Sequence, residues 1–383
     1  MINVIKREKY TIIFLLLISI IILIPLITKN HIYNNITGYD QPRSDFRDFT
    51  TMISGWMNGN EVRNDLYLAR MITGYPMGVI SNATGINIDT ICIIFYFLSL
   101  IIITVAMYLI VSRLFGVGCG IFSIAASVFC STGILAMFKY GMNASILNMY
   151  LVLPLAIIMT TKWFDQKKIV YLVLALFFFG FFSLFHLTSL YLPYAIGMSI
   201  FTFLTYWIIK KKNMLRMIIF LLCILSINII ISHFAFPGET ALNNMAINNI
   251  SSMTSIEEAH YLSNTPLTIT FFIFNYLSIS VLGLLILLVI LLPKYWKEIV
   301  VKEDGKMLLM LLSGFAIVLG AGTFLPLSPE PVRTATDFAT ILSLVVAIVL
   351  YQITKQKNLK VIKIVSCLLV LLGIVPNLIE WIK

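Results

Sequence analysis

The sequence is dominated by apolar runs that follow one another with mostly short polar connections. The runs fall at roughly 10–28, 90–112, 117–137, 145–161, 169–185, 189–209, 217–235, 267–292, 307–325, 338–354 and 361–381. About 20 apolar residues are enough for a helix to cross the hydrocarbon core of a bilayer. The pattern therefore predicts an all-α polytopic membrane protein with about eleven transmembrane helices, forming a single transmembrane domain over residues 1–383.

The composition agrees with this class. The chain is 60% hydrophobic and only 11% charged, whereas charged residues make up about a quarter of a soluble domain. The run at 10–28 follows a basic start and lacks a small-residue cleavage site, so we expect a retained first helix and not a signal peptide. The five cysteines lie within apolar runs without metal-ligand spacing, which predicts small buried side chains.

The formal net charge of +10 raises the question of nucleic-acid binding, and the distribution of the charge argues against it. Most of the 27 basic residues fall at every second junction between apolar runs. This is the positive-inside pattern of membrane proteins, and it predicts a cytoplasmic N-terminus and a multi-pass protein of the cell membrane. The basic excess then faces membrane lipids, and no nucleic-acid partner is expected.

Two of the predicted outer connections are long. Residues 29–89 form the first extracytoplasmic loop, which holds most of the charged side chains outside the basic junctions and in which we expect interfacial helices. Residues 236–266 form the second, which has no basic residue and is rich in Asn, Ser and Thr. A third outer loop at 326–337 is short. The charges of the first loop make it the predicted active region.

A helix is predicted from Asp45 to Met57 in the first loop. Ser44 is a good N-cap, and the NGN at 58–60 is a good stop. The apolar stripe consists of Phe46, Phe49, Ile53, Trp56 and Met57, and the opposite side consists of Arg47, Thr50, Thr51 and Ser54. Such a helix is expected to lie flat on the bilayer surface, with Asp45 and Asp48 at the border of the apolar face.

Two carboxylates at headgroup depth suit transfer of a sugar to a hydroxyl. One aspartate can take the proton from the attacking hydroxyl, and a second can orient the acceptor or bind a divalent metal. A phosphate leaving group needs cationic or N–H partners. The alternative is an interfacial helix whose acids are simply solvated near its positive N-terminal end.

The acidic helix is followed by a second amphipathic stretch and then by Tyr75, Pro76, Met77 and Gly78. Pro76 suits the first turn of a helix, and Asp89 suits the N-cap of the next span, which ends in YLIVSRLFG. Packing and capping are the alternative roles for this element.

These features together resemble the GT-C class of membrane glycosyltransferases, the relatives of protein mannosyltransferases, aminoarabinose transferases and oligosaccharyltransferases. The resemblance covers roughly residues 1–120 by motif and the rest by topology. It implies a polyprenyl-phosphate-linked sugar donor, an inverting displacement, a glycan, lipid or protein acceptor, and a catalytic aspartate in the first outer loop. Carried over, that aspartate is Asp45 or Asp48, with Asp40 as a weaker alternative.

Two features depart from that family. Many members carry a soluble C-terminal domain, which this sequence does not show after its last apolar run, and the acids are not an adjacent pair. The further candidates for substrate binding are Arg47, Tyr75, Lys139, His186 and Arg333. Arg333 is the only basic residue in its outer loop, and in GT-C-like proteins a late outer arginine can meet the donor phosphate. A snorkelling arginine, or one paired with Asp337, is the alternative.

No metal site is predicted. Glu257, Glu258 and His260 resemble metal ligands in type, but their spacing is not that of H-E-x-x-H. Two other classes remain open: a transporter or flippase without covalent chemistry, and a non-catalytic subunit that works with a partner in cell-envelope glycan assembly. Almost no acid or base falls in the middle of a predicted span, which argues against a transporter.

Overall fold

The structure is a computed structural model. It describes residues 45–59, 68–130, 152–184, 266–295, 303–325 and 331–382, together with isolated residues between 200 and 226. Every regular element in these ranges is helical. The helices are α3 (Asp45–Met57), α4 (Leu68–Thr84), α5 (Ile88–Phe115), α6 (Val117–Ile124), the π-helix η1 (Ala125–Cys130), α9 (Leu153–Gln166), α10 (Ile169–Leu184), α15 (Ile269–Asn275), α16 (Ile279–Tyr295), α17 (Glu303–Phe324), α18 (Pro331–Gln356) and α19 (Lys360–Ile382).

Three of these helices are long and apolar enough to cross a membrane: Ile88–Phe115, Asp304–Phe324 and Thr334–Gln356. They match the predicted runs at 90–112, 307–325 and 338–354. Val117–Cys130, Ile169–Phe178 and Ile279–Tyr295 are apolar but shorter. The prediction of helices long and apolar enough to span a membrane is confirmed for these three segments, and the count of eleven stays a prediction.

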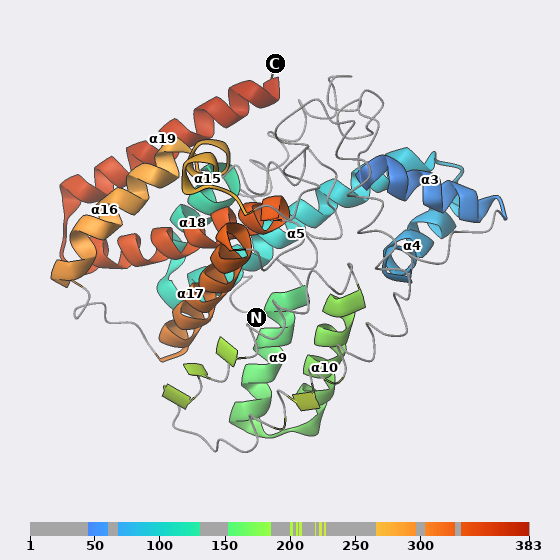
Figure 1. Ribbon diagram of the computed structural model, residues 1–383, viewed down its shortest axis with the longest axis horizontal. Coiled ribbons are helices and arrows are strands. Elements are labelled where there is room, and N and C mark those ends of the chain that lie inside the picture. The colour runs from blue at the N-terminus through green and yellow to red at the C-terminus, as the bar shows by residue number, and fades with distance from the viewer. Residues whose placement is uncertain are drawn as a thin grey trace.

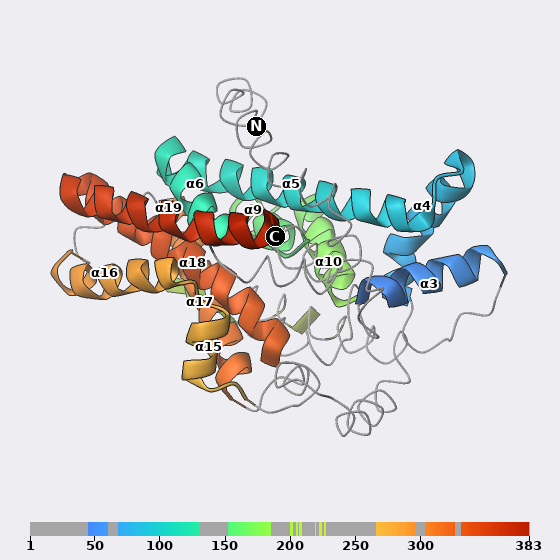
Figure 2. The same ribbon diagram turned by 90° about the horizontal axis from the view of Figure 1, so that it is seen from above.

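Helix α5 extends across the molecule and joins its two ends (Figures 1 and 2). It begins where the side chain of Asn87 accepts a hydrogen bond of 2.8 Å from the backbone N–H of Asp89. The N-cap is therefore Asn87, and the prediction of Asp89 was wrong by two residues. Asp89 lies instead in the first turn, where its negative charge still favours the helix dipole.

The chain reverses after α5 at Gly116, whose φ of 98° few other residues adopt. Helix α6 then packs back against α5. A Cβ added at Gly120 would stand 3.0 Å from side-chain atoms of both Ser112 and Tyr108, and Tyr108 is fully buried. The two helices therefore approach closely only because glycine occupies this position.

The core lies around α18, which packs against α17, α16, α6 and η1 (Figure 1). Its C-terminal end is tied to α5, since the side-chain amide of Gln352 donates a hydrogen bond of 3.2 Å to the carbonyl oxygen of Phe115. The free carbonyls at the end of a buried helix need such partners. The two bonded residues are 237 positions apart in the sequence, and their contact brings the C-terminal ends of α5 and α18 to the same level.

Two predicted boundaries were wrong. The run at 267–292 is divided at residues 276–278 into α15 and α16, and Ser278 caps α16 by accepting a hydrogen bond of 3.2 Å from the N–H of Val281. Helix α18 begins at Pro331, so half of the predicted outer loop at 326–337 is helical. Proline is well suited to the first position of a helix because it has no N–H to satisfy there.

Lysine side chains gather where α5, α16, α18 and α19 meet. The Nζ atoms of Lys294 and Lys357 lie 5.4 and 5.8 Å from the centre of the Tyr295 ring. The Nζ atom of Lys355 lies 3.9 Å from the position that a Cβ of Gly116 would take. We call this end of the molecule the basic end; α3 and α4 lie at the opposite end of α5 (Figure 2).

Candidate functional site

Asp45 and Asp48 occupy the first turn of α3, as predicted. The predicted end of the helix is also confirmed. Met57 is its last residue, and the chain turns at Asn58 and at Gly59, which has a φ of 74°. The backbone N–H of Asn58 still donates to the carbonyl of Ser54 over 3.1 Å. The acidic helix is therefore a short helix of its own, with Asp45 and Asp48 in its first turn.

Helix α3 packs against α4 through Gly78. A Cβ at Gly78 would lie 3.1 Å from the Trp56 side chain and 3.2 Å from that of Ile53, and Ile53 is only 1% exposed. The centre of the apolar stripe therefore contacts protein, and the prediction that it rests on the bilayer needs correction there. Thr50, predicted on the polar side, is also buried. Its position three residues before Ile53 brings it onto the same packed face.

Tyr75 is the predicted substrate-binding residue that the structure places beside the acidic helix. Its ring centre lies 4.4 Å from that of Trp56, with the planes tilted by 47°. Tyr75 is nevertheless 55% exposed. It thus stacks on α3 through one face and presents the rest of its surface to the surroundings. The neighbouring Pro76 lies in the interior of α4 and not in a first turn, because α4 begins already at Leu68.

The connection between α4 and α5 is fixed by side chains. The hydroxyl of Ser81 donates to the carbonyl of Ile86 over 2.7 Å, and the backbone N–H of Ile86 donates to the hydroxyl of Thr84 over 3.3 Å. The buried thiol of Cys92 contacts the sulfur of Met77 at 3.5 Å. Helices α3 and α4 are therefore attached firmly to the first turn of the long helix α5.

Of the other predicted site residues that the structure describes, Arg47 belongs to this corner and Arg333 does not. Asp40, Lys139 and His186 lie outside the described residues, as do Glu257, Glu258 and His260 of the predicted loop at 236–266. Arg47 is in the first turn of α3, and Arg333 is the third residue of α18. The start of α18 and α3 lie apart in both views of the ribbon (Figures 1 and 2).

A second polar group lies on α18, and its burial in a helix was not predicted from the sequence. Asp337 is only 3% exposed although it belongs to a helix that otherwise suits a membrane span. On the preceding turn the hydroxyl of Thr334 accepts a hydrogen bond of 3.4 Å from the hydroxyl of Thr323 on α17. The sequence signal for a helical Asp337 was Pro331, six residues earlier, because a proline can open a helix. The interpretation of 326–337 as a loop left this signal unused.

Aromatic rings close this second corner. Phe338 stacks on Phe272 of α15 at 5.1 Å and meets the edge of Phe324 of α17 at 5.8 Å. The backbone N–H of Leu267 donates to the carbonyl of Thr323 over 2.9 Å. The ends of α15, α17 and α18 are therefore packed together, and Asp337, next to Phe338 in the sequence, is buried.

Within the described ranges, no three His, Cys, Asp or Glu side chains come close enough to hold a metal ion. A divalent metal at Asp45 and Asp48 stays a hypothesis, and a defined site would need further ligands beside these two residues. We therefore derive no step that uses a metal.

The helical fold and its three candidate spans define the class of this chain, an α-helical membrane protein. No protein-family model matches the sequence, and no curated protein matches it. The resemblance to the GT-C class therefore stays a prediction that rests on the residues quoted for it, and the assignment of a particular activity is a proposal.

Proposed function

We propose that the protein is a multi-pass glycosyltransferase of the cell membrane, which moves a sugar from a polyprenyl-phosphate-linked donor to a glycan, lipid or protein acceptor on the extracytoplasmic face. One observation carries the proposal: α3 begins with Asp45 and Asp48 and is packed through Ile53 onto α4, at the start of α5, the first long apolar helix among the described residues. This attachment holds a pair of acids near one end of a span, where a lipid-linked substrate would present its sugar.

In this reaction one of the two aspartates accepts the proton of the acceptor hydroxyl. The hydroxyl oxygen forms a bond to the anomeric carbon while the bond from that carbon to the phosphate oxygen breaks, so the polyprenyl phosphate leaves with the electron pair. The second aspartate orients the acceptor. Arg47 in the same turn supplies a cation for the departing phosphate, and the exposed ring of Tyr75 offers an apolar face to the sugar.

The distribution of charge supports the assignment of faces. The basic end, with Lys294, Lys355 and Lys357, lies at the opposite end of α5 from α3 (Figure 2). Lysine-rich ends of membrane helices stay in the cytoplasm. The acidic helix then belongs to the outer face, where a flipped polyprenyl-linked donor is available.

The test is transfer of a radiolabelled sugar from a panel of polyprenyl-phosphate donors in membranes that contain the full-length protein. We expect Asp45→Asn or Asp48→Asn to lower the rate by about 100-fold or more, since general base catalysis contributes roughly that much. Asp304→Asn is the matched control, because Asp304 is exposed at the start of α17. Normal transfer by both α3 variants at wild-type protein levels would end the proposal.

A transporter is the second candidate, and the buried Asp337 favours it. Ionisable side chains inside membrane helices often belong to substrate or proton pathways. Reconstituted vesicles distinguish the two functions. Substrate-dependent flux that Asp337→Asn abolishes, without any sugar transfer, supports a transporter. Sugar transfer that Asp337→Asn leaves intact supports the glycosyltransferase.

A further inference from the structure

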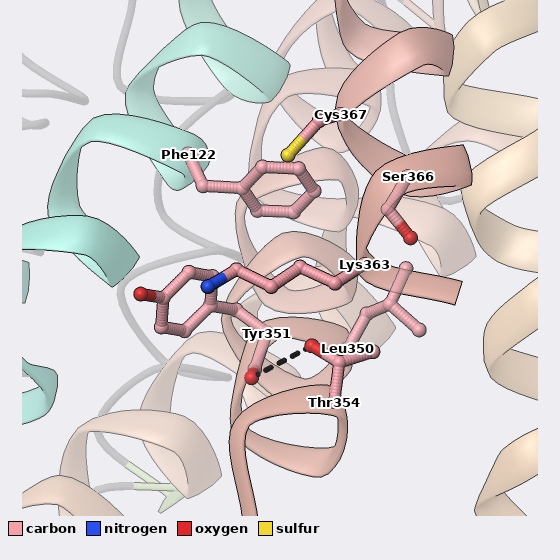
Figure 3. Close-up of a pocket in the computed structure, with 7 residues that line it drawn as sticks. All are labelled: Phe122, Leu350, Tyr351, Thr354, Lys363, Ser366 and Cys367. Carbon is pink, nitrogen blue, oxygen red and sulfur yellow. Dashed lines mark hydrogen bonds between the residues drawn. The ribbon is translucent and has the colours of Figure 1, made fainter. Parts of the chain in front are cut away.

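A small pocket opens at the basic end between α6, α18 and α19 (Figure 3). It lies far along α5 from the acidic helix and takes no part in the proposed reaction. The pocket is lined by Phe122 of α6, by Leu350, Tyr351 and Thr354 of α18, and by Lys363, Ser366 and Cys367 of α19. None of these residues is acidic. Its volume of about 10 Å³ holds a single water-sized group.

The two strongest hydrogen-bond donors of the pocket are adjacent. The Nζ atom of Lys363 lies 5.5 Å from the centre of the Tyr351 ring. Figure 3 shows the lysine side chain extended toward that ring, with its amine over the ring. The hydroxyls of Thr354 and Ser366 already donate to the backbone carbonyls of Tyr351 and Ile362. An anion at the pocket would therefore meet the ammonium group and the phenol.

Tyr351 is held in this position by a glycine. A Cβ at Gly118 would collide with the Tyr351 hydroxyl and would lie 3.0 Å from its Cζ. The ring of Phe122, one turn further along α6, lies 6.0 Å from that of Tyr351. The phenol thus has a fixed place in the wall between α6 and α18.

An apolar surface leads away from the pocket along α19. Ile364, Leu368, Leu371 and Val375 follow one another at helical spacing and are each more than half exposed. Eleven residues of helix, from position 364 to position 375, cover about 16 Å. This length is close to the hydrocarbon thickness of one leaflet, roughly 15 Å. The surface therefore suits an acyl chain whose polar end lies at Lys363.

We propose that this pocket and the adjoining face of α19 bind an anionic glycerophospholipid of the inner leaflet. Lys363 and Tyr351 contact one phosphate oxygen, Lys355 and Lys360 add positive potential nearby, and one acyl chain lies along Ile364–Val375. A lipid accounts for both the basic pocket and the apolar face of α19, because a soluble phosphate would contact Lys363 but not the apolar face. Basic pockets between membrane helices are a known means of binding such headgroups.

The proposal is tested by counting phosphatidylglycerol molecules retained by the purified full-length protein in native mass spectrometry, with phosphatidylcholine as the neutral reference. We expect wild type to retain phosphatidylglycerol preferentially. Lys363→Gln should weaken that binding by about fivefold, since one basic group near a membrane contributes roughly 1 kcal/mol. Lys363→Arg should preserve it, and Lys168→Gln, at the exposed turn between α9 and α10, should not change it.

A competition experiment distinguishes binding of a lipid headgroup from binding of a soluble phosphate compound. Soluble glycerophosphoglycerol should fail to displace the lipid, and Leu368→Ser should weaken retention even though it leaves the charge unchanged. Gly118→Ala provides a second route, because it displaces Tyr351 and should reduce binding without removing a lysine. Equal retention of the two lipids by wild type, or equal phosphatidylglycerol binding by wild type and Lys363→Gln, would overturn the proposal. Full displacement by the soluble headgroup would also overturn it.

Discussion

The rings of Trp56 and Tyr75 stand 4.4 Å apart and join the acidic helix α3 to α4. Aromatic pairs of this kind contribute about 0.5–1.5 kcal/mol beyond the area that they bury. We therefore expect Trp56→Ala and Tyr75→Ala to be non-additive in the free energy of unfolding, with a coupling energy in that range. A double-mutant cycle measured by reversible unfolding in mixed micelles checks this.

Tyr75→Phe removes the hydroxyl of Tyr75 and tests whether the ring alone accounts for its contacts with Trp56 and with the substrate. It keeps the ring and hence the stacking on Trp56, so stability should stay within about 0.5 kcal/mol of wild type. The variant also keeps the apolar face that we propose for the sugar, so transfer from the lipid-linked donor should stay close to wild type, whereas Tyr75→Ala should lower it. A variant that loses stability as severely as Tyr75→Ala would contradict the assignment of the coupling to ring stacking.

Gly78 is predicted to determine whether α3 stays in place. The position where its Cβ would stand is already 3.1 Å from Trp56 and 3.2 Å from Ile53. A large side chain there must push α3 away from α4, and overpacking of this kind costs about 1–3 kcal/mol. We expect Gly78→Leu to lower stability by that amount and to remove sugar transfer, because the carboxylates move with the helix.

Asn82→Leu is the matched control for Gly78→Leu. Asn82 lies on the same helix four residues later but is exposed. It should be close to wild type in both stability and transfer. Trypsin cleavage after Arg47 in the full-length protein gives a further measurement, since a displaced α3 is cut faster. Unchanged cleavage and activity in Gly78→Leu would show that α3 does not depend on this contact.

Gln352 should be important for stability although it takes no part in the proposed chemistry. It is buried, and its amide donates to the carbonyl oxygen of Phe115 over 3.2 Å. Gln352→Leu leaves that carbonyl without its partner, which costs about 1–3 kcal/mol. Gln166→Leu, the same change at the exposed end of α9, should cost less than about 0.5 kcal/mol. Equal effects of the two substitutions on unfolding would refute the role of this hydrogen bond.

The long helices were predictable from the sequence because membrane insertion requires a continuous apolar stretch of nearly fixed length. The run at 90–112 became α5 with only a few residues added at each end. The acidic helix from Asp45 to Met57 was also predictable, since its periodicity and its NGN stop act locally. Local signals of this kind need no knowledge of which helices meet.

The contacts between helices were not predictable in the same way. Gly78 gives no sign in the sequence that it receives Trp56 and Ile53, and Gly118 gives none that it faces Tyr351. Asp337 was assigned to a loop because Pro331 was interpreted as part of that loop, whereas it opens α18. The burial of Asp337 depends on how α18 packs against the rest of the molecule, which the sequence of α18 alone does not give.

The orientation of the molecule in the membrane gives the last prediction. If the basic end is cytoplasmic, a single cysteine at Lys360 at the start of α19 should react with a membrane-impermeant maleimide only after the cells are permeabilised. A single cysteine at Asn58, after α3, should react in intact cells. Both sites are exposed, so accessibility within the protein does not limit labelling.

The five native cysteines must first be replaced by alanine. The buried thiol of Cys130 donates a hydrogen bond of 3.1 Å to the backbone carbonyl of Val370, which this replacement removes. Equal labelling of both single-cysteine proteins in detergent shows that they are folded and present in equal amounts. Labelling of Lys360→Cys but not Asn58→Cys in intact cells would reverse the orientation. It would place the acids of α3 in the cytoplasm, where a polyprenyl-linked donor on the outer face cannot reach them, and the proposed reaction would be excluded.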